Sequence, residues 1–262
     1  MQLLAGFLFA VTIAFGAYRV HSLSLSGAYA AVLVGTVVFG IGGWQWSILL
    51  LVFFVSSSAL TRAFKNRKVS LNEKFSKGGQ RDAGQVIGNG GLATLFAGLH
   101  YFYPDSVWVW LAFAAALAAV NADTWSTELG VLNPHPPRML TNLARQVERG
   151  TSGGVSLYGT FAALAGSALI GLFAAVFAPT GASWISGMWV TLAGFLGSLF
   201  DSLLGATVQA IYYCPACKKE TERHPLHSCG TPTTRIRGWE WLNNDLVNLG
   251  CSLFAVIFVL VI

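Results

Sequence analysis

Residues 106–130 read SVWVWLAFAAALAAVNADTWSTELG, and this stretch decides the fold class. Its first part, residues 106–122, carries no charged side chain and approaches the roughly 20 apolar residues that a transmembrane helix needs. Two carboxylates, Asp123 and Glu128, follow directly. The stretch therefore predicts a membrane-spanning helix that leads into a polar segment.

Outward from this stretch, the chain contains seven further apolar segments. The expected spans are residues 2–18, 23–42, 44–63, 85–103, 106–122, 155–178, 184–210 and 246–262. Charged residues make up 10% of the chain, whereas soluble domains carry about 25%. The first segment lacks a basic start and a small-residue cleavage site, so we interpret it as a retained helix. The sequence predicts an all-α polytopic membrane protein of about eight transmembrane helices, with residues 1–262 as a single integral membrane domain.

The basic residues are distributed asymmetrically in this arrangement. Eight spans place the connections alternately on two sides, and all 16 Lys and Arg residues fall on the same side. The positive-inside rule makes this face cytoplasmic and puts both termini outside. Such a face attracts anionic lipid head groups or phosphorylated substrates, whereas no recognition motif points to nucleic acid. The absence of a transit peptide favours a bacterial inner membrane.

The polar end of the 106–130 stretch is the first candidate site. Asn121, Asp123 and Glu128 emerge there from an apolar helix, and ionisable residues at membrane depth are costly and usually functional. Mg²⁺ typically binds one or two carboxylates together with substrate phosphates. On a straight helix the two carboxylates point about 140° apart, so both can bind one ion only if the helix breaks between them. The alternative is a helix end capped by polar side chains.

A glycine-rich loop directly before the expected 155–178 helix is the second candidate. It consists of Gly150, Thr151, Ser152, Gly153 and Gly154. Glycines let the backbone approach an anion closely, and the free N–H groups of a helix start attract phosphate. Arg145 and Arg149 lie just upstream and would add positive charge. The loop is not a Walker A sequence, and a flexible turn with a serine cap explains it about as well.

Further polar residues are expected at the same interface. Within the 184–210 helix, Ser198, Asp201 and Gln209 share a face with several glycines, which on their own indicate tight helix packing. Asp201 is the exception, and we interpret it as a further metal ligand or a residue that holds the substrate. Two more polar runs contribute Lys77, Arg81 and Asn89 before and within the 85–103 helix, and Asn244, Asp245 and Asn248 at the start of the last helix.

The cysteines form a separate candidate site. Cys214-x-x-Cys217 is followed by His227-x-Cys229, which makes a Cys₃His set that fits a structural Zn²⁺ site. A reducing cytoplasm argues against disulfides there. We therefore predict a small zinc-binding loop at residues 212–232, with unligated thiols as the alternative. Cys251 is expected to be a small core residue.

The polar segments together resemble one membrane family. The motifs are KGGQRDxGQV (77–86), NADTWSTELG (121–130), GTSGGVS (150–156), GSLFDSLLGATVQ (197–209) and NNDxVN (243–248). In combination they resemble the domain of unknown function 92 family, which includes transmembrane protein 19 of animals and the phytyl-phosphate kinase of plant plastids and cyanobacteria.

The resemblance implies a membrane kinase that converts an isoprenoid, phytyl-like monophosphate to its diphosphate with a nucleoside triphosphate, expected to be CTP, and Mg²⁺. For this chemistry our hypothesis assigns Asp123, Glu128 and Asp201 to Mg²⁺, and residues 150–154 to the phosphates. The same hypothesis assigns charge neutralisation at the phosphates to Lys77, Arg81, Arg145 and Arg149. The remaining candidate substrate contacts are Asn89, Asn121, Ser198, Gln209, Asn244, Asp245 and Asn248. A transporter or flippase of a phosphorylated or anionic lipid is the alternative; neither the prenyl chain nor the oligomeric state is indicated.

Overall fold

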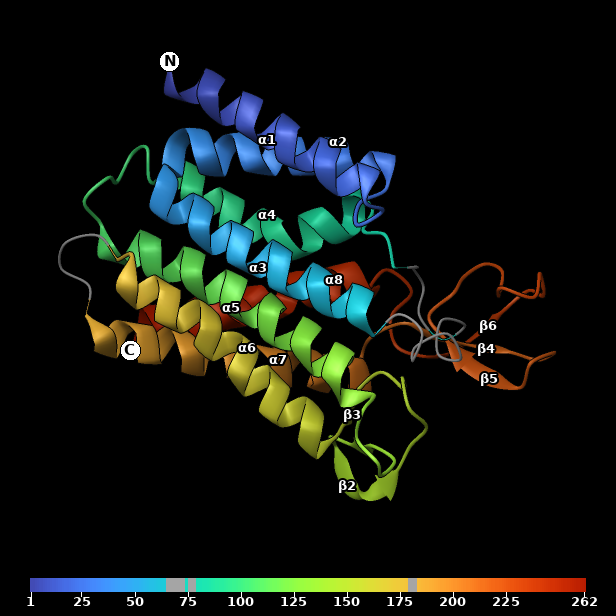
Figure 1. The fold of residues 1–262 in the computed structure, drawn as a ribbon. Coiled ribbons are helices and arrows are strands. Elements are labelled where there is room, and N and C mark those ends of the chain that lie inside the picture. The colour runs from blue at the N-terminus through green and yellow to red at the C-terminus, as the bar shows by residue number, and fades with distance from the viewer. Residues whose placement is uncertain (65–73, 75–78, 179–182) are drawn as a thin grey trace.

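The computed structural model describes residues 1–64, 74, 79–178 and 183–262, and its long helices form one bundle (Figure 1). The helices are α1 (Gln2–Arg19), α2 (Leu25–Val37), α3 (Trp44–Ala63), α4 (Ala83–Leu99), α5 (Val107–Gly130), α6 (Leu157–Val176), α7 (Trp184–Thr207) and α8 (Asn244–Val261). Seven of these segments are long and apolar enough to cross a bilayer, where α2 is counted together with the short π-helix η1 (Val38–Gly42) that extends it. The remaining helix, α4, has 17 residues, at the lower limit for a span.

The two ends of the bundle differ. Both chain termini lie at one end, which we call the far side, and all the strands lie at the other end, which we call the strand side (Figure 1). Arg19 ends α1 at the strand side, and Arg62 lies in the last turn of α3 there. Successive helices run in opposite directions between the two sides, so α4 also traverses the bundle.

Helix α5 is the centre of the bundle and packs against α3, α4, α6, α7 and α8. Its residues 112–122 are all buried. Most of them are alanines, and small residues let neighbouring helices approach closely. A Cβ atom added to Gly194 of α7 would lie 2.5 Å from the Cβ atom of Ala118. The core therefore depends on small side chains along α5.

Several helix ends differ from the prediction. Helix α5 continues without a break to Gly130, eight residues beyond the expected end of the span at residue 122. The segment contains no Gly or Pro before Gly130 that would end the helix. Helix α4 ends at Leu99, not at residue 103. Pro104 accounts for the fact that the helix does not include Tyr103, because the residue before a proline disfavours the helical conformation.

Two small sheets, which the sequence analysis did not predict, shape the connections on the strand side. One has the strand order β2-β1-β3, formed by β1 (Arg138–Met139), β2 (Asn142–Gln146) and β3 (Gly154–Val155). The other has the order β5-β4-β6, formed by β4 (Ile211–Cys214), β5 (Lys219–Thr221) and β6 (Thr234–Arg237). All pairings are antiparallel. The polar connections between α5 and α6 and between α7 and α8 therefore fold into small sheets, which lie over the ends of the helices.

Candidate functional site

A polar cavity of about 700 Å³ opens at the strand side of the bundle. Its lining comes from α3, α4, α5, α7, α8 and the loop between β2 and β3. Of the predicted site residues, the cavity is lined by Arg81, Asn89, Asp123, Glu128, Arg149, Gly150, Thr151, Ser152, Gly153, Gly154, Asp201, Gln209, Asn244 and Asn248. Segments far apart in sequence therefore contribute to one site.

Four predicted site residues are absent from the lining of this cavity, and a fifth cannot be placed. Asn121, Arg145, Ser198 and Asp245 do not line this cavity, and Lys77 lies outside the described residues. Asn121 instead connects three helices: its Nδ2 donates to the Gly166 carbonyl of α6 (2.8 Å), and its Oδ1 accepts from Ser56 Oγ of α3 (3.1 Å). Asn121 thus fixes the position of α5 just before the helix becomes polar.

The two carboxylates of α5 have different surroundings. Since the helix is unbroken, Asp123 and Glu128 point about 140° apart. Glu128 accepts a hydrogen bond from Thr61 Oγ1 of α3 (2.8 Å) and lies near Arg81. Asp123 lies near Asp201 of α7. The cavity thus has one carboxylate beside a guanidinium and a second region where two carboxylates approach each other.

A further acidic residue of the cavity, Glu222, was missed by the sequence analysis. It follows β5, and its Oε1 accepts hydrogen bonds from Ser152 Oγ (2.8 Å) and Gln209 Nε2 (3.0 Å). It also interacts electrostatically with Asp201. In the sequence Glu222 stands in a run of charged residues typical of an exposed loop, and only the β5-β4-β6 sheet places it over the cavity.

Arg81 is held rigidly at the edge of the cavity. Its guanidinium donates to Ser57 Oγ (2.9 Å) and Ser58 Oγ (3.0 Å) and lies over the rings of Phe53 and Phe54. Burial lowers the pKa of Arg81 to about 10, and the nearby Glu128 opposes this shift. The side chain therefore remains positively charged at neutral pH.

The backbone of Arg81 is fixed as well. Its N–H donates to the Ser22 carbonyl and its carbonyl accepts from the Ser24 N–H, both at 3.0 Å. Gly27 of α2 passes so close that an added Cβ atom would collide with the Arg81 carbonyl. The connection between α1 and α2 thus determines where Arg81 lies.

The glycine-rich loop 150–154 lies against the end of α7. Gly150 and Gly153 have φ values of +78° and +82°, which favour glycine. A Cβ atom on Gly153 would lie 2.4 Å from the Ala206 nitrogen. The loop does not lead directly into α6 as expected, because β3 intervenes and the Ser156 side chain caps the helix by accepting from the Gly159 N–H (3.1 Å). Any anion bound here would contact the loop itself.

The Cys/His cluster forms at the end of the β4–β5 hairpin. The ligand atoms of Cys214, Cys217, His227 and Cys229 all lie within 4.8 Å of one another. The buried His227 Nε2 has no hydrogen-bond partner among the described residues. Hydrogen bonds with Thr231 and His227 lower the pKa of the Cys229 thiol to about 6, which favours the thiolate form. The four residues can bind a metal ion.

The cavity carboxylates are more widely spaced than the Cys/His cluster. Within the described ranges, no group of three carboxylates brings its oxygens comparably close together. A divalent cation in the cavity would therefore need ligands from a bound phosphate in addition to protein oxygens.

Comparisons with known proteins agree with the membrane architecture. The family model described as Integral membrane protein DUF92 matches residues 8–256. Protein PGR of Arabidopsis thaliana is 36% identical over 258 residues, which cover 90% of this chain and 87% of that protein. The uncharacterized membrane protein MJ0933 of Methanocaldococcus jannaschii is 33% identical over 187 residues, 70% of this chain and 74% of the relative.

A third relative is chloroplastic by name. Protein VTE6, chloroplastic, of Arabidopsis thaliana is 28% identical over 249 residues, which cover 92% of this chain and 66% of that protein. No solved structure matches the chain. The resemblance drawn from the polar motifs is confirmed: the chain belongs to the integral membrane protein DUF92 family.

Proposed function

We propose that this protein is a membrane kinase that transfers a phosphoryl group from a nucleoside triphosphate, with CTP as the first candidate, to an isoprenoid, phytyl-like monophosphate. The family contains a kinase-type relative in Protein VTE6, chloroplastic. The observation that carries the proposal is that the polar cavity meets an apolar pocket inside the bundle, as a substrate with a charged head and an apolar tail requires.

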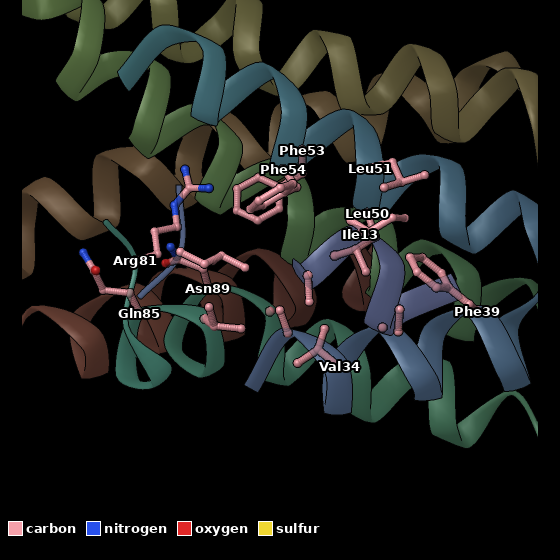
Figure 2. A pocket seen from close by; sticks show the side chains of 17 residues that line it. Ile13, Val34, Phe39, Leu50, Leu51, Phe53, Phe54, Arg81, Gln85 and Asn89 are labelled. Carbon is pink, nitrogen blue, oxygen red and sulfur yellow. The ribbon is translucent and has the colours of Figure 1, made fainter. Parts of the chain in front are cut away.

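The apolar pocket has a volume of about 70 Å³ and lies among α1, α2, α3 and α4 (Figure 2). Its walls include Ile13, Val34, Leu50 and Phe53. Three residues line both this pocket and the polar cavity: Arg81, Gln85 and Asn89. The pocket has room for the part of a prenyl tail nearest the phosphate. A tail seated there would place its phosphate at the Arg81 guanidinium, a positive charge at the junction.

The chemistry needs no general base. An oxygen of the prenyl monophosphate, already anionic, attacks the γ-phosphorus of the nucleotide. The bond from that phosphorus to the β,γ-bridging oxygen breaks, and its electron pair leaves with the nucleoside diphosphate. Catalysis then consists of alignment and charge neutralisation. Arg81, Arg149 and the 150–154 loop line one cavity, which supports our assignment of these residues to the phosphates.

Asp123 and Asp201 are the residues we assign to Mg²⁺. Glu128 was expected as a third ligand of this ion, but on the unbroken α5 it points about 140° away from Asp123, so we do not assign it to the same ion. The fit of the two aspartates to a cation is supported by Asp201 Oδ2, a buried oxygen without a hydrogen-bond partner in the described part of the chain. When bound, Mg²⁺ would neutralise the charge that develops on the transferring phosphoryl group. The protein's part is to hold the two carboxylates near each other on α5 and α7.

The Cys/His cluster is proposed to hold a structural Zn²⁺ ion. Three sulfurs and one imidazole form the closed ligand set of such sites, and the unpartnered His227 Nε2 supports the fit. We also propose that the strand side is cytoplasmic, where nucleotides are available.

The transport alternative finds less support in the described residues. Residues 112–120 of α5, between the polar cavity and the far side, are buried and entirely apolar. A charged head group crossing the bundle would need polar partners along such a path.

The test is phosphoryl transfer by the purified protein in detergent. Labelled nucleoside triphosphates are supplied one at a time with Mg²⁺ and phytyl or geranylgeranyl monophosphate, and labelled prenyl diphosphate is the expected product. Asp201→Asn should abolish transfer. Asp105→Asn, an exposed carboxylate at the far side, is the matched control and should retain it. Absence of transfer with every nucleotide and both prenyl phosphates would overturn the proposal.

A further inference from the structure

The β5-β4-β6 sheet carries the Cys/His cluster at one end and contacts the cavity at the other. We name residues 211–237 the metal module. We propose that metal binding in this module holds the 150–154 loop in its observed position, with Glu222 as the positioning residue. Any effect of this coupling on phosphoryl transfer rests on the proposed function. The coupling between metal binding and the position of the loop does not.

The first link between the module and the loop is Glu222. Its Oε1 accepts from Ser152 Oγ in the middle of the loop (2.8 Å) and from Gln209 Nε2 just after α7 (3.0 Å). Gln209 is buried, so this carboxylate oxygen ties the module to both the loop and the bundle.

The second link is Arg237, the last residue of β6. Its guanidinium donates to the carbonyls of Ala206 and Gly205 at the end of α7, each at 3.0 Å, and to the Ser152 carbonyl at 3.5 Å. Ser152 is therefore contacted by the module through its hydroxyl and through its backbone.

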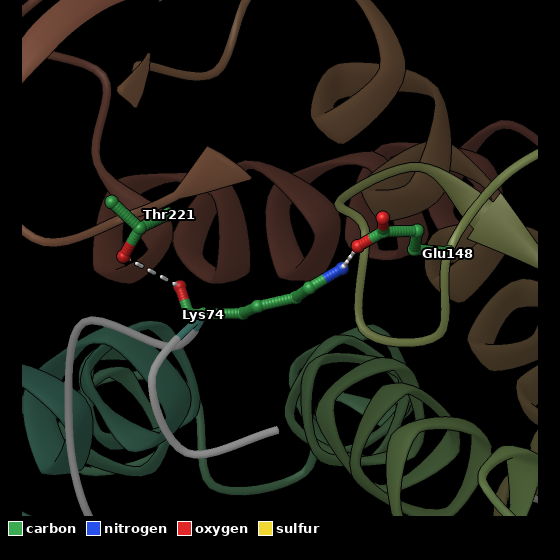
Figure 3. A network of polar contacts seen from close by, with 3 residues as sticks. All are labelled: Lys74, Glu148 and Thr221. Atoms are coloured by element: carbon green, nitrogen blue, oxygen red, sulfur yellow. Dashed lines mark hydrogen bonds and ion pairs between the residues drawn. The ribbon is translucent and has the colours of Figure 1, made fainter. Parts of the chain in front are cut away.

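The third link is Lys74, which crosses from the module to the segment before the loop (Figure 3). Its carbonyl accepts from the Glu222 N–H (2.8 Å) and from Thr221 Oγ1 (3.3 Å). Its Nζ atom donates to Glu148 Oε2 at 2.6 Å. Lys74 thus connects β5 to the residues immediately before Gly150.

Metal binding is what would make these links rigid. The module has three short strands and little core of its own, and domains of this size usually need a metal or disulfides for stability. For such sites the free energy of metal binding is folding free energy. Glu222 and Arg237 both lie on strands of the sheet or next to them, so a loosened sheet would release Ser152 from both.

The first experiment measures metal content in the full-length protein by mass spectrometry. One zinc per chain is expected. Cys217→Ser and His227→Ala should lose it, whereas Cys251→Ser, a buried cysteine of α8 outside the cluster, should retain it. The proposal would be overturned if the protein contained no zinc even after incubation with zinc. It would also be overturned if both cluster variants retained zinc.

The second experiment measures amide hydrogen exchange of residues 150–154 in detergent. Removal of zinc from the wild-type protein by a chelator should accelerate exchange at least about tenfold, as expected for loss of a buried hydrogen bond, and added zinc should restore protection. Because the same folded protein is compared with and without metal, misfolding of a variant does not affect this result. Unchanged exchange would overturn the proposal.

Substitutions of Glu222 separate its positioning role from metal binding. Glu222→Ala should accelerate exchange in the loop while zinc is retained, and Glu222→Gln, whose amide oxygen still accepts both hydrogen bonds, should restore protection. In the transfer assay the alanine variant should raise the KM for the nucleotide more than it lowers kcat. Loop protection in Glu222→Ala equal to the wild type would remove the positioning role. If zinc controls exchange but no transfer occurs, the proposed function alone fails.

Discussion

The two halves of α5 differ in almost every respect although they belong to one unbroken helix. Residues 112–120 are apolar, mostly alanine and all buried. Residues 123–130 are mostly polar, and several of them line the cavity. Asn121 stands between the halves and hydrogen-bonds to α3 and α6. Close packing of the first half thus sets the position of the carboxylates in the second, and substitutions in the halves should affect different properties.

The largest effect is expected from Asp123→Asn in the polar half. The substitution preserves size but removes the charge that we assign to the cation, so transfer should fall at least about 100-fold, the scale of losing one electrostatic contact to a transition state. The thermal unfolding temperature should remain within a few degrees. A steady-state assay with a parallel unfolding scan measures both, and transfer within twofold of the wild type would remove Asp123 from the site.

Next comes Ala118→Leu in the buried half. The Cβ atom of Ala118 faces Gly194 of α7, where little space is available, so the larger side chain should lower the free energy of unfolding by about 1–3 kcal/mol. Thr127→Ala, an exposed position on the same helix, should leave it unchanged. Equilibrium unfolding in mixed micelles measures the difference. Equal stability of the two variants would contradict the division between the halves.

A smaller effect is expected at the boundary. Asn121→Ala removes hydrogen bonds to Gly166 and Ser56, and interhelical hydrogen bonds in membranes contribute about 0.6 kcal/mol each on average. Stability should fall by about 1 kcal/mol, and transfer should fall a few-fold because the carboxylates shift with the helix. A large loss of transfer at unchanged stability would instead identify Asn121 as a substrate contact.

The smallest effect lies outside α5, at the Lys74–Glu148 pair. The hydrogen bond and charge of Lys74 lower the pKa of Glu148, so the pair contributes stability above the ordinary carboxyl pKa and loses it as the pH falls through the lowered value. Since Glu148 is largely exposed, Glu148→Gln should cost less than about 1 kcal/mol at pH 7 and nothing in strong acid. Unfolding curves of both proteins at several pH values test this. A difference that persists unchanged in acid would exclude the ion pair as its cause.

Much of the architecture follows from the sequence because hydropathy determines spans in a bilayer. Each apolar segment expected from the sequence forms a helix. The motifs that contain Asp123, Ser152 and Asp201 line one cavity. The grouping of Cys214, Cys217, His227 and Cys229 also agrees with the spacing of these residues.

Three features could not be predicted from the sequence, because each depends on contacts between segments that are far apart in the chain. Hydropathy alone does not show that α5 continues to Gly130, because its last turns are polar and their helical state depends on neighbouring elements. Glu222 carries no local signal, since β-sheet pairing alone places it beside Ser152. Asn121 looked like a site residue because polar residues in a membrane helix suggest function, whereas its observed hydrogen bonds are to other helices.

The junction at Arg81 has a kinetic consequence. An apolar pocket among α1 to α4 and a polar cavity at the strand side mean that one substrate would arrive from the bilayer and the other from water. The rate should then follow the mole fraction of prenyl phosphate in the membrane or micelle, not its amount per volume of solution. If the proposed function holds, diluting the protein's micelles with more detergent at constant total substrate would slow turnover, while the dependence on nucleotide concentration would remain the same.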